Sequence, residues 1–232
     1  MTLYGPQAGL YDLIYHWKDY GQEAQRVHSL LLDEGVVDGA RVVEAACGTG
    51  QYLQPLGHWY AISGYDLNEG MVAEARRKGL NATTADMREH RFEAADAIVC
   101  LFSSIGYVPP EDLPRVAGCW YASLRAGGVV LVEPWLEPDK AVPGHMATHT
   151  YDSDELKLVR AAVHLREGRV SVLDFHWLVL RPEGVEHFLD PHRLHLTTRE
   201  ELASVFTDAG FSVRIEQDGL MPGRGLLVLR RP

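Results

Sequence analysis

A glutamate and two glycines in the segment VVEAACGTG, residues 42–50, are the residues whose type and spacing most clearly suggest chemistry. The apolar run ends in Glu44 and turns through Gly48 and Gly50, which predicts a buried strand entering a tight loop. Open α/β sheets bind ligands at the carboxyl ends of parallel strands, and glycine there lets the backbone approach a small molecule closely. The segment therefore predicts a small-molecule site at the edge of a parallel sheet.

A dinucleotide site is the alternative for this segment. Its fingerprint requires a third glycine three positions after the second, so that the following helix can pack closely against the strand. Gly48 and Gly50 supply the first two glycines, but the third position is Leu53. The pyrophosphate cradle is incomplete, so the pattern disfavours a nicotinamide or flavin cofactor.

Two aspartates follow the next two predicted strands. Asp66 ends the second strand, where a carboxylate can accept hydrogen bonds from both ribose hydroxyls; the alternative is a helix N-cap for the run that starts near Glu69. Asp86 follows the third strand and can accept a hydrogen bond from an adenine amino group, while Met87 packs on the adenine ring. The alternative for Asp86 is an aspartate that only stabilises a turn. A fourth loop, residues 101–107, follows the fourth predicted strand, where a nucleophile of a second substrate would meet the reactive group of the bound small molecule.

Composition and charge limit the classes of partner. The chain has 232 residues and a formal net charge of -10, with a pI near 5.5. This length fits one sizeable domain or one domain with an extension, and the acidic surface argues against nucleic acid as the main partner. No basic amino-terminal region precedes a long apolar run, and no apolar stretch approaches the length of a membrane span. We expect a soluble, cytoplasmic protein with no membrane partner.

The cysteines and histidines do not predict a disulfide framework or a metal site. The three cysteines include no C-x-x-C pair. The five histidines between residues 164 and 195 match neither H-E-x-x-H nor a helical i, i+4 pair, and strand alternation would place them on two faces. We therefore expect no metal.

Strands and helices alternate from residue 41 to residue 133, which predicts a parallel sheet with right-handed crossovers. The predicted strands of this sheet are 41–46, 60–65, 81–84, 96–101, 128–133, 211–216 and 225–230, and the predicted helices between them are 51–57, 69–78, 111–124 and one that begins after Thr198. The runs 156–165, 169–180 and 185–196 are separated by turn signals and predict an antiparallel meander. The fold class is therefore α/β, a Rossmann-like, seven-stranded, mostly parallel sheet with an antiparallel β extension.

Three regions follow from this order of elements. Residues 1–34 form a helical cap at the amino terminus. Residues 35–140 and 197–232 form the core that binds the cofactor. Residues 141–196 form the antiparallel extension over the acceptor site.

The segment EAACGTG resembles motif I of class I S-adenosylmethionine (SAM) methyltransferases. More of the chain is similar to the deoxyamino-sugar N,N-dimethyltransferases, which methylate the 3-amino group of a dTDP-linked 3-amino-3,6-dideoxyglucose. The matching segments are LYD at 10–12, KDYxxEA at 18–24, ACGTG at 46–50, DMR at 86–88, FSSIG at 102–106, GVVxVEPW at 128–135 and GRGL at 223–226. The resemblance implies a class I fold, SAM as cofactor with S-adenosylhomocysteine as product, and a small-molecule acceptor.

The resemblance and the loops together assign the site residues. Cofactor binding is expected of Tyr11, Tyr20, Ala46, Gly48, Gly50, Asp66, Leu67, Met71, Asp86, Met87 and Leu101. Acceptor binding is expected of Ser103, Ser104, Trp135 and Arg224, with Arg224 near the pyrophosphate, for which a planar guanidinium is well suited. The alternative for Arg224 is a solvated turn residue. Tyr4 and Tyr107 are expected at the reacting amine.

The chain departs from the family pattern at three positions. Motif I opens with Glu44 where the family has Asp, and Leu136 stands where a second tryptophan is typical. Tyr107 stands where the family has a histidine, and a neutral tyrosine hydroxyl can orient an amine but is a poor base near neutral pH.

These departures leave two alternatives open. One is a small-molecule O- or N-methyltransferase with an unrelated acceptor. The other is a SAM-binding protein without transferase activity. A homodimer is also left open by the sequence.

Overall fold

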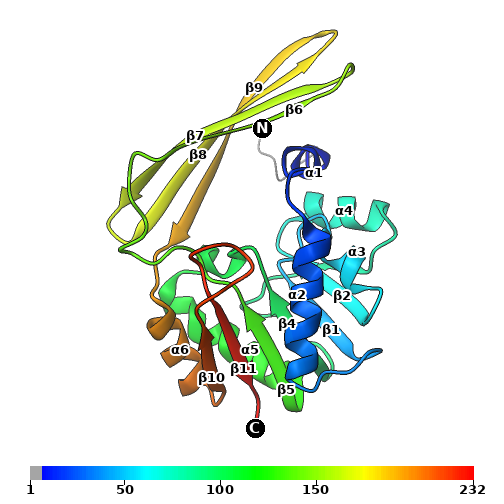
Figure 1. The fold of residues 1–232 in the computed structure, drawn as a ribbon, viewed down its shortest axis with the longest axis vertical. Helices are drawn as coiled ribbons and strands as arrows, with labels where there is room; N and C mark the ends of the chain where they lie inside the picture. Colours follow the sequence, from blue (N-terminus) through cyan, green and yellow to red (C-terminus); the bar gives the residue numbers. More distant parts are fainter. Residues whose placement is uncertain (1–6) are drawn as a thin grey trace.

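The computed structural model describes residues 7–232, which form two β-sheets and the helices around them (Figure 1). The larger sheet contains β1 (Arg41–Ala45), β2 (Ala61–Asp66), β3 (Ala82–Thr84), β4 (Ala95–Cys100), β5 (Leu124–Val132), β10 (Ser212–Glu216) and β11 (Leu226–Arg230). The smaller sheet contains β6 (Met146–Asp152), β7 (Lys157–Glu167), β8 (Val170–Arg181) and β9 (Gly184–His195). The helices are α1 (Gly9–Ile14), α2 (Tyr20–Asp33), α3 (Leu53–Leu56), α4 (Glu69–Arg77), α5 (Leu113–Ser123) and α6 (Arg199–Asp208), with 3-10 turns η1 (Ser104–Tyr107) and η2 (Pro110–Asp112).

The order of the larger sheet is β10-β11-β5-β4-β1-β2-β3, and the predicted seven-stranded, mostly parallel sheet is confirmed. Strands β1 to β5 are parallel to one another, while β11 runs antiparallel to both β5 and β10. The direction of winding reverses between β1 and β4, which is where ligands bind in open α/β sheets. The loops that follow these two strands are therefore placed at the switch point.

The central strands are buried on both faces, which explains their nearly continuous apolar sequence. All side chains of β4 except that of Asp96 are buried, and so are the last five of β5. Helices cover both faces of the sheet, with α2 alongside β1 and β4 in Figure 1. This packing fixes the strand ends that carry the site loops.

The smaller sheet is an antiparallel meander in the order β6-β7-β8-β9 (Figure 1). Strand β6 is absent from the strands predicted by the sequence. It has no buried side chain, and its polar sequence MATHTYD lacks the apolar alternation that marks a half-buried strand. Along β9, by contrast, Phe188, Asp190, His192 and Leu194 are buried and the residues between them are exposed. One face of the extension therefore turns toward the rest of the protein.

Helix α1 joins the extension to the core. Leu10 and Ile14 pack with Leu158, Trp177 and Phe188 of the smaller sheet. Helix α2 begins after Asp19, whose carboxylate accepts a hydrogen bond from the Gln22 amide at 2.8 Å. Helix α6 begins after Thr198, as predicted, and Thr198 and Glu201 form a capping box in which each side chain accepts from the other residue's backbone amide.

Within residues 7–232, no helix has the length and apolar character needed to span a bilayer. In the same residues, no group of three or more histidine, cysteine, aspartate or glutamate side chains is placed to hold a metal ion. Tyr4 lies outside the described residues.

Candidate active site

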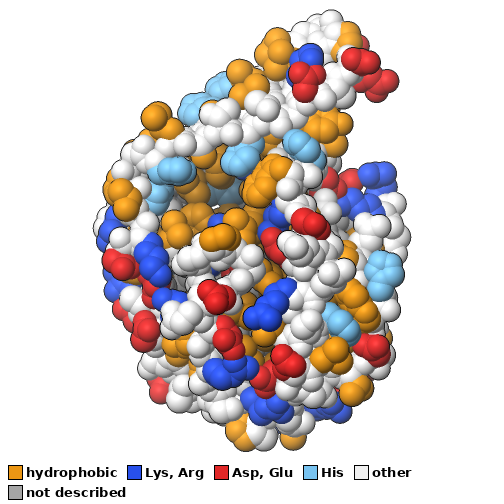
Figure 2. Space-filling view, in the orientation of Figure 1, with side chains coloured by type: hydrophobic (Ala, Val, Ile, Leu, Met, Phe, Trp, Pro, Cys, Tyr) orange, Lys and Arg blue, Asp and Glu red, His pale blue; other side chains and the backbone are white. Residues whose placement is uncertain are grey.

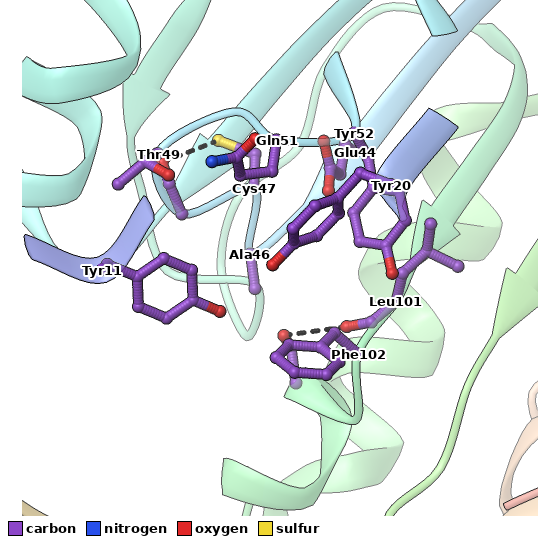
Figure 3. Close-up of a pocket in the computed structure, with 12 residues that line it drawn as sticks. Tyr11, Tyr20, Glu44, Ala46, Cys47, Thr49, Gln51, Tyr52, Leu101 and Phe102 are labelled. Atoms are coloured by element: carbon purple, nitrogen blue, oxygen red, sulfur yellow. Dashed lines mark hydrogen bonds between the residues drawn. The ribbon is translucent and has the colours of Figure 1, made fainter. Parts of the chain in front are cut away.

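A pocket opens at the carboxyl ends of β1 and β4, where the winding of the sheet reverses (Figure 3). The motif I loop forms one wall, the loop after β4 forms the opposite wall, and tyrosines from the amino-terminal helices lie across the opening. The lining residues are Tyr11, Tyr20, Glu44, Ala46, Cys47, Gly48, Thr49, Gln51, Tyr52, Leu101, Phe102 and Ser104. Six of the predicted site residues thus meet in one pocket: Tyr11, Tyr20, Ala46, Gly48, Leu101 and Ser104.

Both pocket loops hold non-glycine residues in the left-handed region. Ala46 has φ 55°, and Phe102 and Ser103 have φ 51° and 64°. Within residues 7–232 these are the only non-glycine residues with positive φ. Such backbone costs on the order of 1 kcal/mol or more per residue and persists where the surrounding structure holds it, which is common at binding sites. The strain therefore marks the same two loops as the pocket.

The motif I loop is fastened to the amino-terminal helices by side chains. Thr49 Oγ1 donates to the Asp12 carboxylate at 2.5 Å, and Lys78 both pairs with Asp12 and donates to the Thr49 carbonyl at 2.9 Å. The LYD segment is therefore attached directly to the GTG turn. This attachment holds Tyr11 at the pocket opening.

Asp66 supports the motif I loop from the neighbouring strand. Its two carboxylate oxygens accept hydrogen bonds from the amides of Gly48 at 2.9 Å and Asn68 at 2.8 Å. Burial raises the pKa of Asp66, and these two amides oppose that rise. The alternative of an N-cap role is wrong, because Asn68 caps α4 by accepting from the Met71 amide.

Asp86 lies at the end of β3, but its carboxylate is already engaged. Arg88 donates to it from its backbone amide at 2.9 Å and from its guanidinium, which also pairs with Asp112 at 3.0 Å. The hydrogen bond from Arg88 lowers the pKa of Asp86. This geometry favours the turn-aspartate alternative.

The remaining predicted cofactor residues do not line this pocket. The Leu67 side chain is exposed, and Met71 is buried among Leu10 and Ile14 of α1 and residues of the extension. Met87 packs against buried hydrophobic residues of the larger sheet and its helices. At Gly50, an added Cβ would meet the Leu80 side chain at 2.4 Å. Gly50 is therefore needed for close packing of the loop.

Glu44 is a buried carboxylate at the base of the pocket. It is 2% exposed, and its Oε2 has no hydrogen-bond partner within residues 7–232. Burial, and to a lesser extent the Asp66 carboxylate, raises the pKa of Glu44 well above the ordinary value. A buried carboxylate without a partner is unfavourable, so this pocket suits a ligand that brings a cation or a hydrogen-bond donor.

The sequence predictions missed a lysine beneath the pocket. Lys18 is 7% exposed, pairs with Glu23, and lies 4.6 Å from the centre of the Phe102 ring. Glu23 also accepts a hydrogen bond from the Tyr52 hydroxyl. Burial lowers the pKa of Lys18. The KDYxxEA segment, which contains both Lys18 and Glu23, was the available signal.

Arg224 lies beside the pocket rather than in a solvated turn. Its guanidinium stacks 4.6 Å from the Trp135 ring and 5.5 Å from the Phe102 ring, and donates to Ser103 Oγ at 2.8 Å. Ser103 in turn donates to the Pro134 carbonyl at 2.7 Å. Three predicted acceptor residues, far apart in the sequence, are therefore in direct contact.

Glu133 holds the backbone around this contact. Its carboxylate accepts from the Phe102 amide at 2.7 Å and from the Met221 amide at 2.9 Å. Burial raises the pKa of Glu133, while the charge of Arg224 lowers it. The glutamate of the EPW segment thus ties the loop after β4 to the loop that carries Arg224.

Tyr107 contacts a histidine of the extension. Its hydroxyl is hydrogen-bonded to Nδ1 of His192, whose Nε2 lies 2.9 Å from Asp190. The sequence predictions considered His192 only as a metal ligand, and the alternation of β9, which places residues 190 and 192 on one face, was the signal available. Figure 2 shows a hollow between the extension and the core, with hydrophobic and histidine side chains around it.

The sequence and structure of this chain match known methyltransferases. The methyltransferase domain family matches residues 42–128. A dTDP-3-amino-3,6-dideoxy-alpha-D-glucopyranose N,N-dimethyltransferase of Streptomyces fradiae is 34% identical over 230 residues, which is 96% of this chain and 89% of that protein. The chain belongs to the family of dTDP-amino-sugar N,N-dimethyltransferases.

Solved structures of similar proteins agree with this membership. The crystal structure of Streptomyces venezuelae DesVI superposes with a TM-score of 0.89 at 32% identity and covers 96% of this chain and 97% of that one. The SAM-bound amino pentose methyltransferase CalS10 of Micromonospora echinaspora has a TM-score of 0.85 at 28% identity, covering 96% and 97%. This protein is therefore a SAM-dependent methyltransferase, and SAM is its cofactor.

Proposed function

We propose that this enzyme transfers methyl groups from SAM to the amino group of a nucleotide-linked amino sugar. The observation that carries the proposal is the contact of Arg224 with Trp135 and Ser103 beside the SAM pocket. A guanidinium stacked on an indole and fixed by a hydroxyl is preorganised to bind a diphosphate. The relatives that match nearly the whole chain are named for dTDP-linked amino sugars.

We assign SAM to the pocket at the ends of β1 and β4. Glu44 fits this ligand because its unpartnered, buried oxygen would receive a cationic group of the amino acid part. Asp66 would accept from the ribose hydroxyls, since each of its oxygens has a second lone pair beyond the bond to a backbone amide. Tyr11 and Tyr20 would close the opening.

When bound, SAM supplies an activated methyl group, and S-adenosylhomocysteine is the product. The role of the protein is to hold a neutral amine in line with that methyl group and to exclude water. The loop after β4 is suited to this, because Phe102 faces the SAM pocket on one side and the Arg224 guanidinium on the other. Ser103 and Ser104 then set the position of the acceptor.

Two acceptors that share one amino sugar test the proposal, one linked to dTDP and one without the nucleotide diphosphate. Loss of charge-assisted contacts of about 1.5–3 kcal/mol each should lower kcat/KM roughly tenfold to a hundredfold or more for the second acceptor. Mass spectrometry of the products gives the number of methyl groups. Equal kcat/KM for the two acceptors would favour a methyltransferase with an unrelated acceptor. Tight SAM binding with no turnover of any amine would favour a binding protein without transferase activity.

We extend the proposal to a homodimer formed through the outer face of the extension. This face exposes Val163, Leu165, Leu178, Val185 and Leu189. Clustered apolar side chains on one face are typical of a surface that another chain covers. Light scattering should give twice the mass of 25.9 kDa, and a monomer at all concentrations would contradict this part. The cytoplasmic location stays a prediction of the sequence.

A further inference from the structure

Tyr107 and His192 connect the acceptor side of the site to the interior of the extension. Tyr107 ends η1, three residues after the pocket residue Ser104, and its side chain is 44% exposed. Its hydroxyl bonds to Nδ1 of His192, which is only 8% exposed. The exposed end of this contact is therefore a tyrosine, and the buried end is a histidine.

Asp190 continues the connection beneath the histidine. Asp190 is 1% exposed, and its Oδ2 lies 2.9 Å from Nε2 of His192. Its other oxygen, Oδ1, is buried and has no hydrogen-bond partner within residues 7–232. A carboxylate in this position favours the tautomer with the proton on Nε2, which leaves Nδ1 to accept from Tyr107.

We infer that His192, oriented by Asp190, removes the proton of the acceptor amine through the Tyr107 hydroxyl. The inference rests on the proposed function, since it requires an amine as acceptor. An alkyl amine is mostly an ammonium ion near neutral pH and has no lone pair with which to attack. A tyrosine alone is a poor base, but a tyrosine that passes its own proton to a histidine is not limited in this way.

The proton balance of the step is complete. The ammonium gives one proton to the Tyr107 oxygen as the Tyr107 hydroxyl proton moves to Nδ1 of His192. The products are a neutral amine, an unchanged tyrosine and an imidazolium that faces the Asp190 carboxylate. The amine then forms the N–C bond as the methyl C–S bond breaks. For a second transfer, the imidazolium returns its proton to solvent and the methylated ammonium is deprotonated in the same way.

The groups that face His192 from neighbouring elements are consistent with this role. On its own strand, the buried neighbour is Asp190, and Tyr107 faces it from η1. From β8 the Phe175 ring packs at 5.0 Å, and the Arg160 guanidinium of β7 lies 4.5 Å from the centre of that ring. The Asp174–Arg193 ion pair lies nearby, with Arg193 also donating to the His192 carbonyl. Among the described residues, the charged group that bonds the imidazole is the Asp190 carboxylate.

The pH dependence of kcat/KM distinguishes a proton route from a structural role. The variants are Tyr107→Phe, His192→Gln and the double variant, measured with a nucleotide-linked amino sugar from pH 6 to pH 10. Near pH 7 each single variant should lose roughly a hundredfold in kcat/KM, at the lower end of general-base effects, and the double variant should lose no more than either. The loss should shrink toward zero as pH passes the pKa of the acceptor amine, because the amine then arrives neutral.

His164→Gln is the matched control. His164 is 5% exposed on the same sheet, and its ring bonds Ser171 at 2.7 Å. Its substitution should leave the pH profile unchanged. A loss in Tyr107→Phe that is the same at every pH would overturn the inference and leave the proposed function standing.

A second measurement does not depend on turnover. Long-range 15N NMR of protein labelled at histidine reports the tautomer of each imidazole. The signals of His192 are assigned as those that disappear from the spectrum of His192→Gln. We expect the Nε2–H tautomer at pH 8, with an Nδ1 shift that changes in Tyr107→Phe. An Nδ1–H tautomer would overturn the inference even if no amino sugar is methylated, whereas absence of turnover with the expected tautomer would count against the proposed function.

Discussion

The two halves of the site are built in different ways. The half to which we assign the cofactor is formed by backbone: the GTG turn, the left-handed Ala46 and the amides bound by Asp66. The acceptor half is formed by side chains from distant parts of the chain, such as Ser103 with Arg224 and Tyr107 with His192. A backbone cradle constrains residue types over a few adjacent positions, whereas side-chain contacts depend on the whole fold.

This difference indicates which half of the site can accept substitutions. Gly48 and Gly50 have φ 53° and 81°, a backbone that other residues rarely adopt, and an added Cβ at Gly64 of the adjacent strand would lie 2.6 Å from Cys47 Cβ. The other half depends on contacts between side chains, such as Tyr107 with His192, so a substitution there leaves the backbone of the motif I loop in place. We therefore expect substitutions in the first half to change SAM binding and those in the second to change acceptor kinetics.

The largest expected effect is that of Asp66→Ala on SAM affinity. The substitution removes a bidentate carboxylate and frees the Gly48 amide, so Kd for SAM should rise roughly tenfold to a hundredfold, or about 1.5–3 kcal/mol. Calorimetry on the folded variant measures this. Asp86→Ala is the comparison, and its effect should be smaller because Arg88 already occupies that carboxylate. An unchanged Kd for SAM in Asp66→Ala would show that Asp66 does not bind the ribose hydroxyls of SAM.

Glu44→Gln tests the cost of the buried carboxylate. Because burial raises its folded-state pKa, Glu44 contributes favourably at low pH, and this contribution is lost as pH rises from the ordinary carboxyl range through the folded pKa. Without SAM, the variant should be more stable than wild type by at least about 1 kcal/mol at pH 8, and this difference should shrink toward pH 4. Denaturant unfolding at several pH values measures it. SAM binding should be weaker in the variant, and a pH-independent difference would contradict the explanation.

Arg224→Lys tests the acceptor half. The substitution keeps the charge but loses the planar fork and the stacking on Trp135, so KM for a diphosphate-linked acceptor should rise about tenfold while SAM affinity stays unchanged. Steady-state kinetics and calorimetry separate the two effects. Arg115→Lys, at an exposed ion pair with Glu89, is the control. Equal changes in SAM affinity and acceptor KM would remove the separation of the two halves.

The sequence could predict the cofactor half because its signals are local. A strand, a GTG turn and an aspartate at the next strand end each occupy a few adjacent residues, and the seven-stranded sheet follows from the alternation of elements. The same reasoning did not predict the contact of Arg88 with Asp86, because that contact depends on side-chain rotamers that spacing does not reveal.

The acceptor half was predictable only in part. The family resemblance placed Arg224 and Trp135 together, but His192 was missed because its partner Tyr107 is 85 residues away and on another element. Strand β6 was missed because it lacks a buried face. Contacts of this kind are set by how the extension lies over the core, which no local pattern encodes.

The smallest effect expected here separates strain from hydrogen bonding at Ser103. Its φ of 64° favours glycine, and its hydroxyl links Arg224 to the Pro134 carbonyl. Ser103→Ala and Ser103→Gly both remove the hydroxyl, so each should raise acceptor KM only a few-fold, as expected for a hydrogen bond of about 1 kcal/mol. Ser103→Gly should be more stable than Ser103→Ala by about 1 kcal/mol, since glycine adopts this backbone without strain. Equal stability of the two variants would show that the loop relaxes out of the left-handed region. A KM unchanged in both would show that Arg224 is positioned by Trp135 alone.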